Sequence, residues 1–166
     1  MIKNKNFTKA EPGKQEMTLV REFNAPPELI FQVMTDPKQI PHWWGPRRLT
    51  TKVDKMEAKD GGSWRFIQHD IEGNEYAFHG VFHEVSFPVR TIQTFEWEGY
   101  PEKGHVILET AHYEELPNSR TKVTIQSIFQ SVEDRDGMIA AGAEEGLESY
   151  DRIEEILIEM KKSGLF

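Results

Sequence analysis

The chain has 166 residues, a formal net charge of −8 and no cysteine. This length fits one domain with a single core, and the missing cysteine excludes disulfides, thiolate metal sites and thiol nucleophiles. The acidic balance disfavours nucleic acid as the main partner, because a nucleic-acid backbone binds a basic surface.

Residues 1–15 are polar and are interrupted by Pro12 and Gly13, without the apolar core that a secretory signal needs. We expect them to form a flexible tail, followed by a single domain over residues 16–166. No apolar run approaches the roughly 18 residues of a membrane span, so the sequence predicts no membrane insertion. A cytoplasmic location fits both observations and the absence of cysteine.

Strand-forming residues alternate loosely over residues 16–24, which predicts a first strand. A proline pair at 26–27 ends it, and the second proline can occupy the first turn of a helix. Apolar residues at helical spacing predict a short helix over 27–36. A second short helix is expected over 37–43, ended by the Gly-Pro turn at 45–46.

The middle of the chain contains six further strand-like segments, separated by turn residues. Consecutive strands at hairpin spacing pair with their neighbours, so we expect an antiparallel meander. The six segments are residues 50–57, 63–69, 76–85, 90–97, 105–116 and 120–129.

The last segment has the apolar period of a helix, which we expect to run without interruption from about residue 133 to 162. At about 1.5 Å per residue it would be roughly 45 Å long, enough to cross a small sheet. The glutamates on its other face are most simply solvated. The order of elements therefore predicts an α+β fold in which the sheet curls around the final helix.

Several short motifs are shared with a known family: REFNAPP (21–27), TDP (35–37), HWWGP (42–46), GGSWR (61–65), FHGVFHEV (78–85), TFEWEG (94–99), and EG followed by YDRI (145–153). On these motifs the chain resembles the helix-grip superfamily. That superfamily includes the steroidogenic acute regulatory lipid-transfer domains, the birch-pollen allergen and the polyketide cyclases. Within it, the chain is most similar to the family named after the activator of heat-shock protein 90 ATPase.

The resemblance implies a curved antiparallel sheet of about seven strands around a long C-terminal helix, with two short helices after the first strand. It also implies that a cavity between sheet and helix binds a small apolar or aromatic molecule. A polyketide cyclase-like or hydrolase-like enzyme is the alternative, and a module that interacts with a chaperone ATPase is a third. A chaperone partner is not expected, because the heat-shock activator carries a second, N-terminal domain that a chain of this length does not hold.

The adjacent residues Trp43 and Trp44 at the end of the second short helix point about 100° apart, so they cannot face the same neighbour. We expect one to fill the core and the other to border a cavity, unless both simply pack on the sheet. Gly142 and Gly146 remove side-chain volume from the helix, which leaves either a close helix–sheet approach or a cavity. The expected ligand-binding residues are Trp44, Trp64, Phe66, Phe78, Phe95, Trp97, Tyr113, Met138, Gly142, Gly146 and Tyr150.

The sequence offers little for catalysis. His79 and His83 lie four residues apart on a strand, about 13 Å along its axis, so no metal site is expected. No nucleophile, phosphate-loop or dinucleotide motif is present, so no cofactor is expected. Acid–base chemistry by a buried carboxyl stays open, with Glu84 and Glu96 as weak candidates. A homodimer also stays open, through an edge strand such as residues 16–24.

Overall fold

The computed structural model describes residues 6–166, and their side chains other than those of 6, 143 and 144. These residues form one eight-stranded sheet in the order β1-β2-β8-β7-β6-β5-β4-β3, with every neighbouring pair antiparallel. The strands are β1 (Asn6–Lys9), β2 (Glu16–Phe23), β3 (Thr50–Met56), β4 (Ser63–His69), β5 (Glu75–Ser86), β6 (Arg90–Trp97), β7 (Ile107–Leu116) and β8 (Arg120–Ile128).

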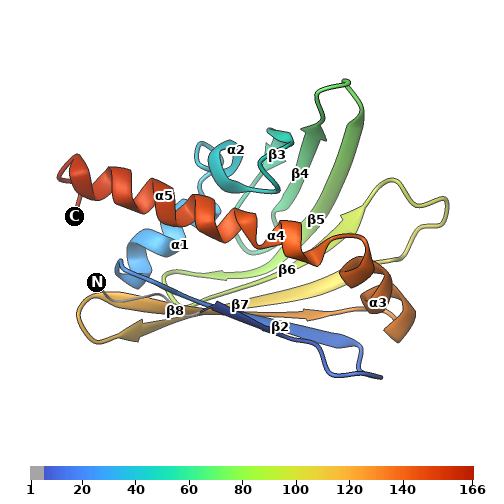
Figure 1. Ribbon diagram of the computed structural model, residues 1–166, viewed down its shortest axis with the longest axis horizontal. Helices are drawn as coiled ribbons and strands as arrows, with labels where there is room; N and C mark the ends of the chain where they lie inside the picture. The colour runs from blue at the N-terminus through green and yellow to red at the C-terminus, as the bar shows by residue number, and fades with distance from the viewer. Residues whose placement is uncertain (1–5) are drawn as a thin grey trace.

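The last six strands of the chain, β3 to β8, form the predicted meander. The curved sheet confirms the expected helix-grip fold. In Figure 1 β3, β4 and β5 stand at a steep angle to β2, β7 and β8, so that the sheet has a concave side. The C-terminal helices cross this concave side (Figure 1). The core lies between them and the sheet, since Ile153 and Leu157 of the last helix are buried with Phe23 and Val123.

Two short helices connect β2 to β3, as predicted: α1 (Pro27–Thr35) and α2 (Ile40–Trp43). Proline occupies the first turn of both, where its missing N–H leaves no hydrogen bond unmade. The Trp43 indole is buried against α1, and its Nε1 donates a hydrogen bond to the Val33 carbonyl at 3.0 Å. This bond fixes α2, and with it the following Trp44, at one end of the sheet.

The prediction of one continuous C-terminal helix was wrong, because three helices occupy this segment. They are α3 (Val132–Ala140), α4 (Ala143–Gly146) and α5 (Glu148–Lys162). Gly142 lies between the first two with a φ of 124°, a conformation outside the helical region that glycine adopts readily. At about 1.5 Å per residue α5 alone spans roughly 22 Å. None of the helices within residues 6–166 is long and apolar enough to cross a membrane.

The expectation of a flexible tail over residues 1–15 needs a correction. Residues 1–5 lie outside the described range, but Asn6–Lys9 form β1, which pairs with β2 from Asn6↔Arg21 to Lys9↔Thr18. The sheet therefore has eight strands rather than about seven. Strand β2 also has a neighbour on each side, so it is not the open edge that was expected to pair with a second copy.

Arg21 fixes α5 to the sheet. It faces the concave side with Leu19 and Phe23, because alternate residues of a strand share a face. Its buried guanidinium donates hydrogen bonds to Asp151 Oδ1 at 2.9 Å and to Glu154 Oε2 at 2.7 Å. Hydrogen bonds between ionised groups are stronger than neutral ones. Strand β2 is thus tied to the N-terminal half of α5.

Replacing Arg21 with alanine should lower the free energy of unfolding by roughly 2–3 kcal/mol, because two carboxylates lose a buried partner and a hole remains. Urea denaturation measures this change. Arg47→Ala is the matched control, because Arg47 also pairs with α5, through Glu155, but is exposed. Its loss should stay below about 1 kcal/mol. Equal losses in the two variants would contradict the role given to Arg21.

Candidate ligand-binding cavity

Three cavities lie between the concave side of the sheet and the C-terminal helices. The inner cavity (≈ 120 Å³) is bounded by Trp64 and Tyr113, the outer cavity (≈ 430 Å³) by Trp97 and Tyr100, and the side cavity (≈ 530 Å³) by Met17 of β2. The outer and side cavities adjoin, since both are lined by Phe95, Ile107, Met138 and Gly146. Their volumes fall within the several hundred cubic ångströms usual for small-molecule sites.

Aromatic side chains from β4, β5 and β6, together with Trp44 at the end of α2, form the wall between the inner and outer cavities. Trp44 is at its centre, with its ring centroid 5.1 Å from that of Phe66 and 5.2 Å from that of Phe78. Trp64 and Phe95 complete the cluster. Most of these ring pairs meet edge-on or tilted, as aromatic quadrupoles favour. Trp43 is buried in the core and also borders the inner cavity, whereas Trp44 packs on the sheet and lines both the inner and the outer cavity.

The turn after Trp44 holds it against α5. Gly45 has a φ of 89°, and a Cβ there would lie 1.9 Å from Nε2 of Gln68, so the position requires glycine. Its N–H donates to Ser149 Oγ at 2.8 Å, and its carbonyl accepts from Arg152 at 3.0 Å. These two bonds position the floor of the outer cavity relative to the helix that covers it.

Paired polar groups surround the mouth of the outer cavity. His105 Nδ1 lies 3.0 Å from Asp134 Oδ2, and this hydrogen bond raises the pKa of His105. The imidazole also stacks on Tyr100, with ring centroids 4.6 Å apart. On the other side Arg48 pairs with Glu145 at 3.2 Å. Among the described side chains, no group of three metal-binding residues is close enough together to hold an ion.

One polar row crosses the concave face of the sheet. Gln93 of β6 is the register partner of Glu109 of β7, and Glu109 is the partner of Ser127 of β8. Side chains of direct partners lie about 5 Å apart at Cβ. Glu109 shares its face with the buried Ile107 and Ala111, and it lines both the inner and the side cavity. A carboxyl group therefore faces an otherwise largely apolar interior.

Burial raises the pKa of Glu109 from 4.5 to about 7, against a weak opposing hydrogen bond from Ser127 Oγ at 3.5 Å. The side chain is half-buried, and the surface that it keeps lies against the two cavities. Tyr150 of α5 lines the same two cavities, and burial together with the Glu109 charge raises the pKa of its hydroxyl. Burial likewise raises the pKa of Tyr113.

All eleven residues predicted to bind a ligand line at least one of the three cavities. The glycines do so for a different reason than expected, because they do not form a pair within one helix: Gly142 separates α3 from α4, and Gly146 ends α4. A Cβ at Gly146 would meet nothing within 4 Å, so the sheet does not approach closely there. Trp44, Trp64, Phe66, Tyr113 and Tyr150 line the inner cavity; Trp44, Phe78, Phe95, Trp97, Met138, Gly142 and Gly146 the outer; Phe95, Met138, Gly146 and Tyr150 the side cavity.

Glu84, a candidate for acid–base chemistry, lies away from the cavities. A β-bulge follows Phe82, which pairs with Gln93, and Glu84 then pairs with Ile92. The extra residue turns Glu84 to the outer face, although it has the parity of the buried Phe82. There it accepts hydrogen bonds from Arg90, which lowers the pKa of the Glu84 carboxyl.

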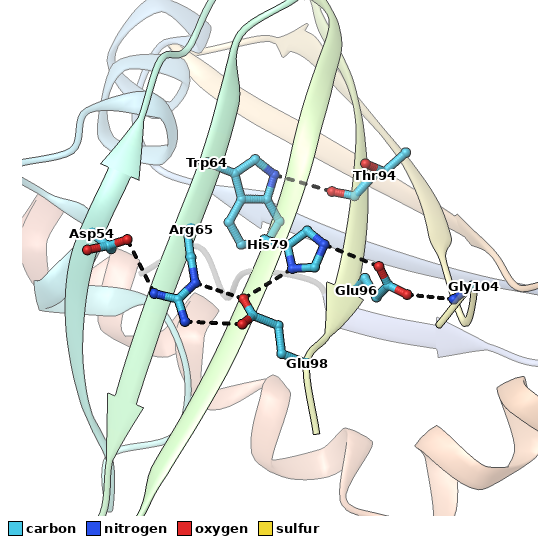
Figure 2. Close-up of polar contacts among 8 residues, drawn as sticks. All are labelled: Asp54, Trp64, Arg65, His79, Thr94, Glu96, Glu98 and Gly104. Carbon is cyan, nitrogen blue, oxygen red and sulfur yellow. Dashed lines mark hydrogen bonds and ion pairs between the residues drawn. The ribbon is translucent and has the colours of Figure 1, made fainter. Parts of the chain in front are cut away.

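Glu96, the second candidate, also belongs to the convex face. Figure 2 shows its carboxylate between the His79 ring, at 3.2 Å, and the backbone N–H of Gly104, at 2.8 Å. Its neighbours in the strand, Phe95 and Trp97, face the cavities, and alternation places Glu96 on the opposite side. The same outer network continues through Glu98, Arg65 and Asp54 (Figure 2).

Residues 24–157 match the family model described as "Activator of Hsp90 ATPase homolog 1-like protein". The chain belongs to this family. The match begins just after β2 and extends through most of α5, so it includes the aromatic wall, Glu109 and Tyr150. None of the curated proteins compared with the chain matches it.

Several solved structures have the same fold. A protein from Arthrobacter aurescens is 25% identical with a TM-score of 0.83, over 92% of this chain and 91% of that chain. A protein from Rhodobacter sphaeroides is 22% identical with a TM-score of 0.81, over 92% and 99%. An HSP90 activator from Plasmodium falciparum is 18% identical with a TM-score of 0.53, over 69% and 72%. The last two likenesses show the fold alone.

The Glu109 carboxyl should make the protein less stable as pH rises. Its folded pKa lies above its unfolded value, so the folded state binds the extra proton and loses stability between about pH 4.5 and pH 7. In Glu109→Gln this loss should disappear, so the stability of the variant relative to the parent should rise by about 3 kcal/mol between pH 4.5 and pH 7.

Urea unfolding at several pH values measures the effect, and Glu84→Gln is the control. The pKa of Glu84 is lowered in the folded state, so this substitution should change the pH dependence in the opposite direction. A parent protein and a Glu109→Gln variant with parallel stability profiles would show that Glu109 is not buried in solution.

Proposed function

We propose that the protein binds a small, largely apolar molecule between the curved sheet and the helices α3, α4 and α5. The observation that carries this proposal is the pair of adjoining cavities of ≈ 430 and ≈ 530 Å³ beneath these helices. Both cavities have the size of small-molecule sites and open to the surface, so a ligand can enter them. Membership of the family, whose fold is the helix-grip fold, agrees with the proposal.

The chemistry of the walls supports an apolar ligand. Phe78, Phe95 and Trp97 present flat, rigid surfaces, and Ile107 and Met138 add aliphatic surface between them. Transfer of each buried methylene from water stabilises a complex by about 0.8 kcal/mol, and several kcal/mol are lost with the freedom of the ligand. A ligand of about ten carbons would therefore bind with weak to moderate affinity.

A second function, acid–base catalysis, is favoured by one observation: Glu109 has a pKa near 7 and faces the cavity. A carboxylate with this pKa can take a proton from the carbon next to a ketone, while a hydroxyl such as that of Tyr150 donates a hydrogen bond to the ketone oxygen. Deuterium exchange into 2-decanone, followed by NMR in heavy water, tests this function. Loss of exchange in Glu109→Gln would support it, and exchange at the uncatalysed rate in the parent protein would exclude it for this probe.

Filling the space should prevent binding. Ile107 lines both large cavities, so Ile107→Trp should weaken the binding of Nile red, a neutral apolar fluorophore, by tenfold or more. The indole ring of the new tryptophan can extend into the cavity. The variant should therefore lose less free energy of unfolding than the roughly 3 kcal/mol that an overpacked core can cost. Fluorescence titration measures the affinity.

Leu108→Trp is the matched control, because Leu108 is the next residue of the same strand and is 40% exposed on the opposite face. It should bind Nile red as the parent protein does. Equal binding by the parent and both variants would mean that the dye binds elsewhere, and the proposed function would lose its support.

A further inference from the structure

The cavities combine an apolar surface with one concentrated group of polar atoms. On the sheet side this group contains Gln93, Glu109 and Ser127, which are register partners in adjacent strands. On the helix side Tyr150 lines both cavities that Glu109 lines. Ligand pockets of this kind use a few polar groups to fix the orientation of an otherwise apolar molecule.

Most of the hydrogen-bonding capacity of this group is unused. The contact of Glu109 with Ser127 is long, at 3.5 Å, and only one of its carboxyl oxygens takes part. The Tyr150 hydroxyl donates to no group among the described residues. Both side chains keep some exposed surface where they line the cavities, so water or a polar atom of a ligand can supply a further partner there.

Charge limits what that polar atom can be. The described residues that line the inner and side cavities include no lysine, arginine or histidine. The basic side chains nearest the mouth, Arg48 and His105, each have a carboxylate partner of their own. A ligand carboxylate or phosphate would thus lie near Glu109 with no positive charge to stabilise it.

A cationic ligand is also disfavoured. Pairing an ammonium group with Glu109 would remove two charges from water, and the desolvation of a buried ion pair often exceeds its attraction. A neutral group avoids this cost, because the Glu109 carboxyl is protonated in about half of the molecules near pH 7. In this form it can donate a hydrogen bond, as can the Tyr150 hydroxyl.

We infer that the ligand is a mostly apolar molecule with one neutral ketone or hydroxyl oxygen, which accepts hydrogen bonds from the protonated Glu109 carboxyl and from the Tyr150 hydroxyl. This inference rests on the proposed binding function and adds the chemical class of the ligand. It also implies that binding keeps a proton on Glu109.

The proton requirement predicts a pH dependence. Tyr113 from the same strand and Tyr150 from α5 are the titratable groups that line the inner cavity with Glu109, and both stay neutral because burial raises their pKa values. Arg48, His105, Asp134 and Glu145 line the adjoining outer cavity, where they form ion pairs with one another. Affinity for a neutral ligand should therefore be constant in acid and should fall as pH rises through about 7.

Three probes with ten-carbon chains test the inference: 2-decanone, decylamine and decanoate, each competing with Nile red between pH 5.5 and 8.5. The parent protein should bind 2-decanone at least tenfold more tightly than decanoate at neutral pH. Its affinity for 2-decanone should fall roughly tenfold between pH 7 and pH 8.5, as expected when one proton is linked to binding. Circular dichroism of each variant checks that the fold is kept.

Two variants separate the role of the Glu109 proton from that of the Tyr150 hydroxyl. Glu109→Gln keeps a neutral donor of the same shape, so it should bind 2-decanone with an affinity that no longer changes with pH. Tyr150→Phe should bind 2-decanone more weakly at every pH but keep the pH dependence. A parent affinity for 2-decanone that does not change with pH would overturn the inference, as would tighter binding of decylamine that is lost in Glu109→Gln.

Failure of the inference can be told apart from failure of the proposed function. If Nile red binds the parent and not Ile107→Trp, the cavity binds apolar molecules whatever the decyl probes show. If neither Nile red nor any decyl probe binds, the proposed function fails, and the chemical class inferred here fails with it.

Discussion

The ion pairs of Arg21 with Asp151 and Glu154 decide how the last helix lies on the sheet. They join a buried guanidinium in β2 to the N-terminal half of α5. Ile153 and Leu157 of the same helix pack into the core with Phe23 and Val123. The outer and side cavities are lined instead by Met138 of α3 and Gly146 of α4. The contacts that hold α5 on the sheet are therefore largely separate from the residues that line these two cavities.

Much of this architecture can be predicted from the sequence because the strands are regular. The turn residues between them and the strand-forming composition place six meander strands within two residues of their observed ends. Local sequence patterns predict secondary structure less well where contacts with distant residues determine the backbone conformation. The polar segment Asn6–Lys9 has little strand character of its own and becomes β1 because β2 offers it an unpaired edge. The break at Gly142 is equally hidden, since a glycine with small neighbours fits a helix pattern until its backbone turns away.

The aromatic residues of the site follow directly from strand alternation, which explains why their prediction succeeds. The carboxyl groups illustrate both the power and the limit of the same rule. Glu109 has the parity of Ile107, Ala111 and Tyr113, so strand alternation alone indicates that it faces the interior, although it is absent from the predicted site. Glu96 has the opposite parity to its aromatic neighbours and lies outside, as the rule requires. Glu84 violates the rule because a bulge inserts one residue before it, and no local pattern reveals a bulge.

Dividing the C-terminal segment at Gly142 also separates two tasks that a single rod would combine. The ion pairs of Arg21 secure α5 on β2, whereas Met138 of α3 and Gly146 of α4 line the outer and side cavities. Substitutions at these two positions can reshape that space without touching the ion pairs of Arg21. Ligand specificity can therefore change during the evolution of this chain while its thermal stability is conserved.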